Sequence, residues 1–244
     1  MTKGLLAVGL VALAAMPMAA RADIITGVLN ITGTAEFTST GVTFLGNEFS
    51  INSPAAAQQG GFEALEGTMG TIDNVTNPPD AVGALDVPDF MTFDAAPNIT
   101  ITLTFLDAGI DGAAGCTSTP PAAGQICTPN LPSQSPFNFQ NISSTSSILT
   151  FGINGVEVDS LTGDTAPITG LFTLPFSTDS FQDLLSTAGG GGSVTTSFAG
   201  QFTVVQTSPT PEPGTLIFML AGFGMLVLVR LLSSRSMATN SDRI

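Results

Sequence analysis

Carboxylates are the only side chains that could perform acid–base or metal chemistry in most of this 244-residue chain. Residues 23 to 210 contain 17 Asp or Glu and no Lys, Arg or His, and the whole chain lacks Tyr and Trp. This composition excludes Ser–His–Asp and Cys–His nucleophiles, Schiff-base lysines and arginine clamps on phosphate. A glycosidase-type pair of acids can be drawn from any of the 17, but the wide aromatic platforms typical of sugar sites are missing. We therefore expect a protein that is not an enzyme.

Two acidic segments carry the oxygen ligands that Ca²⁺ prefers. They are "LDVPDFMTFD", with Asp86, Asp89 and Asp94, and "LDAGIDG", with Asp107 and Asp111. Neither follows the EF-hand spacing. These five aspartates are the candidate metal ligands, with solvated turn acids as the simpler interpretation, and no other cofactor is expected.

The charge of this region also limits its partners. A net charge of −17 between residues 23 and 210 repels phosphate backbones, so nucleic acid is excluded as a partner. The hydrophobic fraction of the whole chain is 43%, and the 15 Phe between residues 23 and 210 supply material for a core.

The two cysteines, Cys116 and Cys127, have ten residues between them in "GCTSTPPAAGQIC". This spacing does not match a redox C-x-x-C, and a chain without His cannot build a Cys/His metal site. In an exported protein the pair predicts one structural disulfide.

Alternation of apolar and polar residues predicts strands that would position these groups. In "NITITLTFLD", Ile99, Ile101, Leu103 and Phe105 share one face, and "GSVTTSFAGQFTVV" alternates in the same way. Asn154-Gly155 separates two further apolar runs, which predicts a hairpin turn there. One short helix is indicated after Ser180, with Asp183 three residues on and Gly189 at its end.

These elements predict an all-β fold with one short helix. About ten short strands separated by turn signals favour an antiparallel β-sandwich, with a jelly roll as one variant. We assign this acidic β-sandwich ectodomain to residues 23–205.

The N-terminus resembles a secretory signal peptide over residues 1–22. Lys3 precedes an apolar stretch, and Ala20-Arg21-Ala22 forms a small-x-small cleavage site, with Ala20 and Ala22 as its small residues. Signal peptidase is therefore an expected partner, and the mature chain would begin at Asp23.

The C-terminus predicts a membrane stage. Residues 206–214 form a Pro-rich linker with a Pro-Glu-Pro motif, residues 215–232 a single transmembrane helix, and residues 233–244 a cytoplasmic basic tail. The apolar segment Leu216 to Leu232 spans roughly 25 Å against a hydrocarbon core of about 30 Å. The anchor in the membrane is therefore marginal in length.

The order of Pro211-Glu212-Pro213, an apolar helix, Arg230 and Arg235 resembles the PEP-CTERM sorting signal. Four residues separate the two arginines, whereas the family usually has a tight basic cluster. The resemblance implies processing by exosortase, an integral-membrane transpeptidase-like enzyme of Gram-negative bacteria that often make exopolysaccharide and biofilm.

Two functions follow as hypotheses. The first is a non-enzymatic structural or interaction protein, exported, held briefly in the inner membrane and sorted to the outer envelope, cell surface or extracellular matrix. The second is a Ca²⁺-dependent module at the surface that binds polysaccharide, such as exopolysaccharide, or another ligand through the five aspartates.

Overall fold

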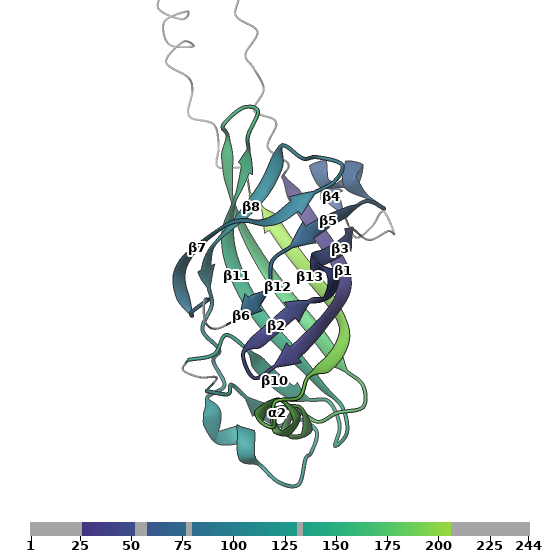
Figure 1. The fold of residues 1–244 in the computed structure, drawn as a ribbon, viewed down its shortest axis with the longest axis vertical. Helices are drawn as coiled ribbons and strands as arrows, with labels where there is room; N and C mark the ends of the chain where they lie inside the picture. Colours follow the sequence, from purple (N-terminus) through teal and green to yellow (C-terminus); the bar gives the residue numbers. More distant parts are fainter. Residues whose placement is uncertain (1–25, 52–57, 77–79, 131–133, 206–244) are drawn as a thin grey trace, which may run out of the picture. The chain divides into compact units, whose positions relative to one another are not determined.

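A closed antiparallel barrel with one α-helix is formed by the residues that the computed structural model describes, which are 26–51, 58–76, 80–130 and 134–205 (Figure 1). The predicted mostly-β fold with a short helix is therefore confirmed. Thirteen strands belong to one sheet. Their bounds are β1 (Gly27–Thr38), β2 (Gly41–Phe44), β3 (Glu48–Ile51), β4 (Gln59–Gly60), β5 (Met69–Ile72), β6 (Val75–Thr76), β7 (Gly83–Phe93), β8 (Ile99–Leu106), β9 (Ile126–Cys127), β10 (Asn138–Asn141), β11 (Ser147–Asp159), β12 (Thr165–Phe176) and β13 (Val194–Val204).

The sheet closes into a barrel because β11 pairs with β12, the strand at the opposite end of the strand order. Hydrogen-bonded strands follow the order β12-β13-β1-β3-β5-β7-β8-β11, and β11 also pairs with β12 along most of its length. A sandwich would instead require two separate sheets packed face to face. The expected β-sandwich is therefore not the architecture that the described residues form. Both architectures alternate inward and outward residues along each strand, so the sequence pattern does not distinguish them.

The predicted hairpin at Asn154-Gly155 is wrong, because β11 runs straight through both residues. Asn154 of β11 pairs with Phe105 of β8, and Gly155 pairs with Leu103. Thr104 is therefore the extra residue of a β-bulge in β8. A β-carbon on Gly155 would lie 2.5 Å from the Thr102 carbonyl oxygen. The glycine therefore allows a close approach of two strands and does not form a turn.

The same bulge moves the last predicted inward residue of β8 to the outer face of the sheet. Ile99, Ile101 and Leu103 are buried as expected, whereas Phe105 is 40% exposed and Leu106 is buried in its place. An extra residue shifts the alternation by one position, so every residue beyond the bulge changes face.

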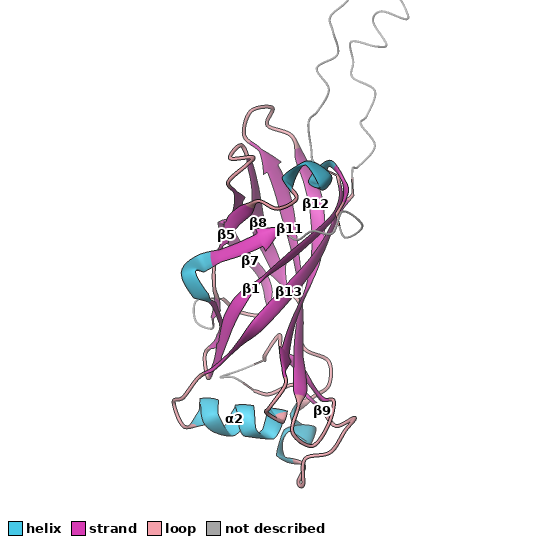
Figure 2. Ribbon diagram, turned by 90° about the vertical axis from the view of Figure 1, so that its right-hand side faces the viewer, coloured by secondary structure: helices cyan, strands magenta, loops and turns pink. Residues whose placement is uncertain are grey.

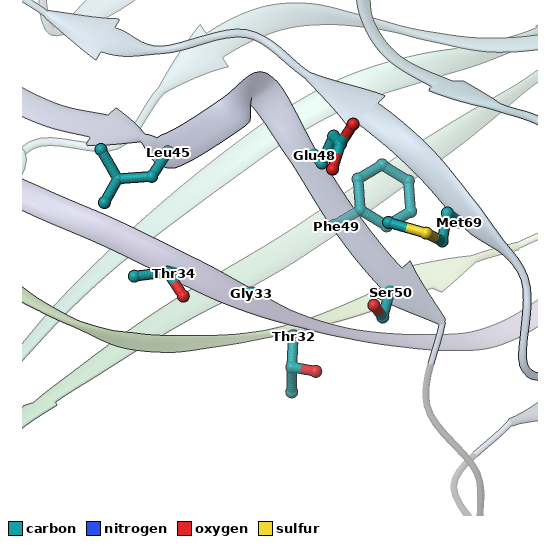
Figure 3. A pocket seen from close by; sticks show the side chains of 8 residues that line it. All are labelled: Thr32, Gly33, Thr34, Leu45, Glu48, Phe49, Ser50 and Met69. Carbon is teal, nitrogen blue, oxygen red and sulfur yellow. The ribbon is translucent and has the colours of Figure 1, made fainter.

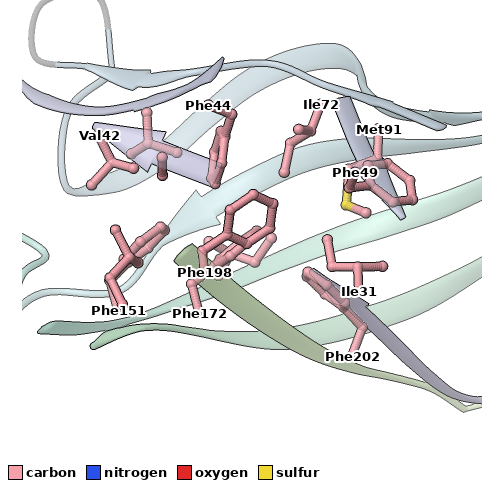
Figure 4. Close-up of a cluster of buried hydrophobic side chains, with 14 of the residues drawn as sticks. Ile31, Val42, Phe44, Phe49, Ile72, Met91, Phe151, Phe172, Phe198 and Phe202 are labelled. Carbon is pink, nitrogen blue, oxygen red and sulfur yellow. The ribbon is translucent and has the colours of Figure 1, made fainter. Parts of the chain in front are cut away.

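Phenylalanine fills the interior of the barrel (Figure 4). Phe151 and Phe172 stack with ring centroids 4.8 Å apart, and Phe44 packs edge-on against Phe198 at the same distance. Burial of each such side chain stabilises the fold by about 1.5–3 kcal/mol. Glycines lie opposite several of these rings, as Gly33 does opposite Phe198. Glycines opposite phenylalanines therefore leave room for the large rings in an interior of limited width.

Helix α2 (Phe181–Gly189) lies at one end of the barrel (Figures 1 and 2). Ser180 is the N-cap, since its Oγ accepts a hydrogen bond from the Asp183 N–H at 3.3 Å and donates one to Asp183 Oδ2 at 2.6 Å. The helix buries Phe181, Leu184 and Ala188. The predicted helix is confirmed, with its cap and its apolar face.

The predicted segments 1–22, 206–214, 215–232 and 233–244 lie outside the described residues. Within the residues that are described, no helix has the length and apolar character needed to cross a membrane.

Candidate functional site

The five candidate Ca²⁺ ligands are distributed over strand β7 and the loops that follow β7 and β8. Asp86 and Asp89 belong to β7 and Asp94 follows it, while Asp107 and Asp111 follow β8. In the described part of the chain, no three Asp, Glu, Cys or His side chains gather into a group that could hold a metal ion. The Ca²⁺ ligand set is therefore not assembled among those residues.

Two of these aspartates take part in local structure. Asp107 Oδ1 accepts a hydrogen bond from Asn154 Nδ2 at 3.0 Å, beside the bulge of β8. Asp89 has a positive φ of 53°, where β7 shifts register between Val87 and Met91. Asp tolerates this left-handed conformation better than most residues. Its position therefore serves the backbone of a bulge.

Two acids of β11 point into the barrel, and the sequence analysis did not single them out. Glu157 and Asp159 are each 1% exposed on the inward side of the strand. Asp159 Oδ1 accepts hydrogen bonds from Asn98 Nδ2 at 3.0 Å and from the Leu161 N–H at 2.8 Å. The Asn98 bond, followed by that from Leu161, lowers the pKa of Asp159 below its usual value of 3.8. Asp159 thus holds the β11–β12 turn against the start of β8.

Asp80 is a third buried acid, 8% exposed, just before β7. Its Oδ2 accepts a hydrogen bond from the Thr76 N–H at 3.1 Å, and its own N–H donates to the Thr76 carbonyl at 2.7 Å. Burial raises the pKa of Asp80, the Thr76 bond opposes that rise, and the charge of Asp73 adds to it. The alternation pattern contains no signal for this residue, because it lies outside the strands, between β6 and β7.

The structure pairs Cys116 with Cys127 in a disulfide, with their Cα atoms 5.0 Å apart. Amide side chains attach this loop to the end of the barrel. Gln182 of α2 donates from Nε2 to Gln125 Oε1 at 2.7 Å, and Asn141 of β10 donates from Nδ2 to Gln182 Oε1 at 2.8 Å. One hydrogen-bonded network therefore joins the disulfide loop, the helix and the barrel. These amide side chains have a structural role.

Two shallow hollows lie on the outside of the barrel. The first, of about 180 Å³, lies over β1, β3 and β5, with Glu48 and Met69 beside it (Figure 3). The second, of about 240 Å³, lies over β12 and β13 and is lined by Thr169, Gly170, Leu171, Gln201 and Thr203. The first hollow includes a carboxylate, whereas the lining of the second has no charged side chain.

Charge is divided unevenly around the barrel. Residues 45 to 94, which contain β3, β5 and β7, carry eight Asp or Glu. The outward positions of β8, β11, β12 and β13 carry none, and those of neighbouring β1 carry only Glu36. We call the outward residues of β12 and β13, together with those of residues 27–34 of β1, the uncharged face. Its most exposed strands carry Thr165, Pro167, Thr169, Leu171 and Pro175 on β12, and Thr195, Ser197, Ala199, Gln201 and Thr203 on β13.

The chain matches no protein-family model, no curated protein and no solved structure. Its function is therefore argued from its own residues.

Proposed function

We propose that this protein is an exported structural or interaction protein of the cell envelope or extracellular matrix, delivered there by a C-terminal signal that exosortase reads. One observation carries the proposal. Pro211-Glu212-Pro213, an apolar segment and the arginines Arg230 and Arg235 follow one another at the end opposite a signal peptide. The helix would hold the protein in the inner membrane until processing releases it.

Features of the described domain support a role of this kind. Its interior is filled by phenylalanine side chains, and its loop near α2 carries a disulfide, a bond that persists in oxidising compartments. Residues 23–210 lack the basic side chains on which most nucleophilic and phosphoryl-transfer sites depend. We therefore assign the domain a structural role and no catalytic one.

The test is the intact mass of the protein purified from its native host through a tag placed after Asp23. The proposal expects loss of residues 1–22 and of the C-terminal segment beyond the Pro-Glu-Pro motif. In a strain that lacks exosortase, the C-terminal segment should remain. A mature protein that still carries residues 216–244 in the normal strain overturns the sorting part of the proposal.

A matched pair of variants separates the motif from the linker. The first variant replaces the motif with alanine at Pro211, Glu212 and Pro213, and it should not be processed. The second variant replaces Thr207, Ser208 and Thr210 of the same linker with alanine, and it should be processed normally. Equal processing of both variants would contradict recognition of the motif.

A further inference from the structure

We infer that the uncharged face is a surface through which two copies of this chain associate. The inference goes beyond the proposed function and does not depend on sorting by exosortase. It rests on the division of charge around the barrel and on the side chains at the centre of the face.

The centre of the face is a set of aligned rows across three adjacent strands. Leu171 of β12 lies opposite Gln201 of β13, which lies opposite Asn30 of β1. In the next row Thr169 lies opposite Thr203. Figure 2 shows the long antiparallel strands of this side of the barrel. The rows therefore present hydroxyl, amide and methyl groups on neighbouring strands.

An exposed apolar side chain stands in the middle of these rows. Leu171 is 51% exposed and borders the 240 Å³ hollow with Gln201 and Thr203. In a two-fold arrangement each copy presents the same patch, so the Leu171 of one copy faces the hollow of the other. An apolar centre surrounded by neutral polar groups is the usual composition of a protein interface.

Charge favours a second copy as the occupant. Each copy carries 17 carboxylates and no basic side chain between residues 23 and 210, so most pairs of faces bring like charges together. Such juxtaposition opposes association. Two uncharged faces avoid it, because β12, β13 and residues 27–34 of β1 carry no outward carboxylate. A charged partner of either sign would find nothing complementary there.

The size of the face predicts weak association. Three strands at about 4.8 Å spacing and eleven residues at about 3.3 Å cover roughly 500 Å² on each copy. Roughly 1,000 Å² in total lies at the lower limit of specific interfaces. A neutral glycan is a less suitable occupant, because ligand sites are usually clefts of about 300–1,000 Å³, whereas the hollow on this face is shallow and of about 240 Å³.

The experiment is sedimentation velocity of the full chain in a non-ionic detergent over a wide range of protein concentration. The proposal expects a reversible monomer–dimer equilibrium that strengthens with added NaCl, since salt screens the remaining repulsion. Leu171→Asp places a carboxylate at the centre of both faces and should weaken dimerisation about tenfold or more. Thr203→Asp, in the adjacent row, should do the same.

Met69→Asp is the matched control, because Met69 is an outward apolar residue of β5, 42% exposed, on the acidic side of the barrel. It should leave dimerisation unchanged. Circular dichroism and the urea midpoint of each variant exclude unfolding as the cause of a change. Sedimentation as a monomer at all concentrations, or equal dimerisation of wild type and Leu171→Asp, overturns the inference. The inference would also be overturned if the wild type is purely monomeric, binds a neutral glucan, and loses that binding in Leu171→Asp. The face would then be assigned to glycan binding.

Discussion

Gly170 and Phe202 are direct partners on β12 and β13, and a β-carbon on Gly170 would lie 2.2 Å from Cδ1 of the Phe202 ring. Phe202 is fully buried and packs edge-on against Phe172, with ring centroids 5.2 Å apart. The ring therefore occupies the volume that any side chain at position 170 would need.

Gly170→Val should consequently destabilise the protein by about 1–3 kcal/mol, as overpacked cores do. The urea midpoint measures the change. Thr169→Val, the outward neighbour, is the control and should have little effect. In the Gly170→Val background, Phe202→Leu should recover part of the lost stability, because the smaller side chain vacates the contested space. A Gly170→Val variant as stable as the wild type would disprove the packing argument.

The Cys116–Cys127 disulfide should contribute about 3 kcal/mol, because it closes a loop of about ten residues. In urea denaturation, the double variant Cys116→Ser, Cys127→Ser should show a free energy of unfolding lower by that amount, and reduction of the wild type should reproduce the loss. Reductant should not affect the double variant. If the oxidised and reduced proteins unfold at the same urea concentration, the disulfide is not stabilising.

Asp80→Asn should stabilise the protein at neutral pH. Because burial raises the pKa of Asp80, the folded state favours the protonated acid, and stability falls as pH rises from 3.8 through the raised pKa. The advantage of Asp80→Asn should appear over that window and vanish below pH 3.8. Urea unfolding at a series of pH values measures it. Asp94→Asn, an equal change of charge at an exposed position, is the control. A pH-independent difference would point to a cause other than ionisation.

Asp159→Asn should have the opposite effect. Because the hydrogen bond from Asn98 lowers the pKa of Asp159, the ionised acid stabilises the fold above pH 3.8, and this contribution is lost as pH falls through the lowered pKa. The variant should be less stable than wild type at pH 7, with the difference shrinking on acidification. Asn98→Ala should cause a similar loss, and the double variant should lose less than the sum of the two. Additive losses would show that the two side chains act independently.

Removal of divalent metal should leave the melting temperature unchanged. The described residues gather no group of three acids, so calorimetry with EDTA and with Ca²⁺ should agree at matched ionic strength. NaCl should raise the melting temperature in both, because it screens repulsion within a domain that carries only negative charge. A rise specific to Ca²⁺ would return the aspartates to consideration as ligands.

Local patterns predicted the helix and the inward residues of strands that have no bulge. The alternation in β13 identifies Phe198 and Phe202 as inward residues, and both are buried. Ser180 and Asp183 mark the start of α2, since a cap is formed by residues three apart. The bulge at Thr104 was not predictable, because it depends on how β8 meets β11.

The sequence by itself therefore determined the inward residues of regular strands such as β13, where the helix begins, and that carboxylates are the only charged groups between residues 23 and 210. These properties are local or compositional. Only the tertiary structure decided that β11 pairs with both β8 and β12, which closes the barrel, and that Asn30 lies beside Gln201. Both depend on pairing between segments far apart in the chain. The division of charge into an acidic side and an uncharged face follows from that pairing, because it requires the order of strands around the ring.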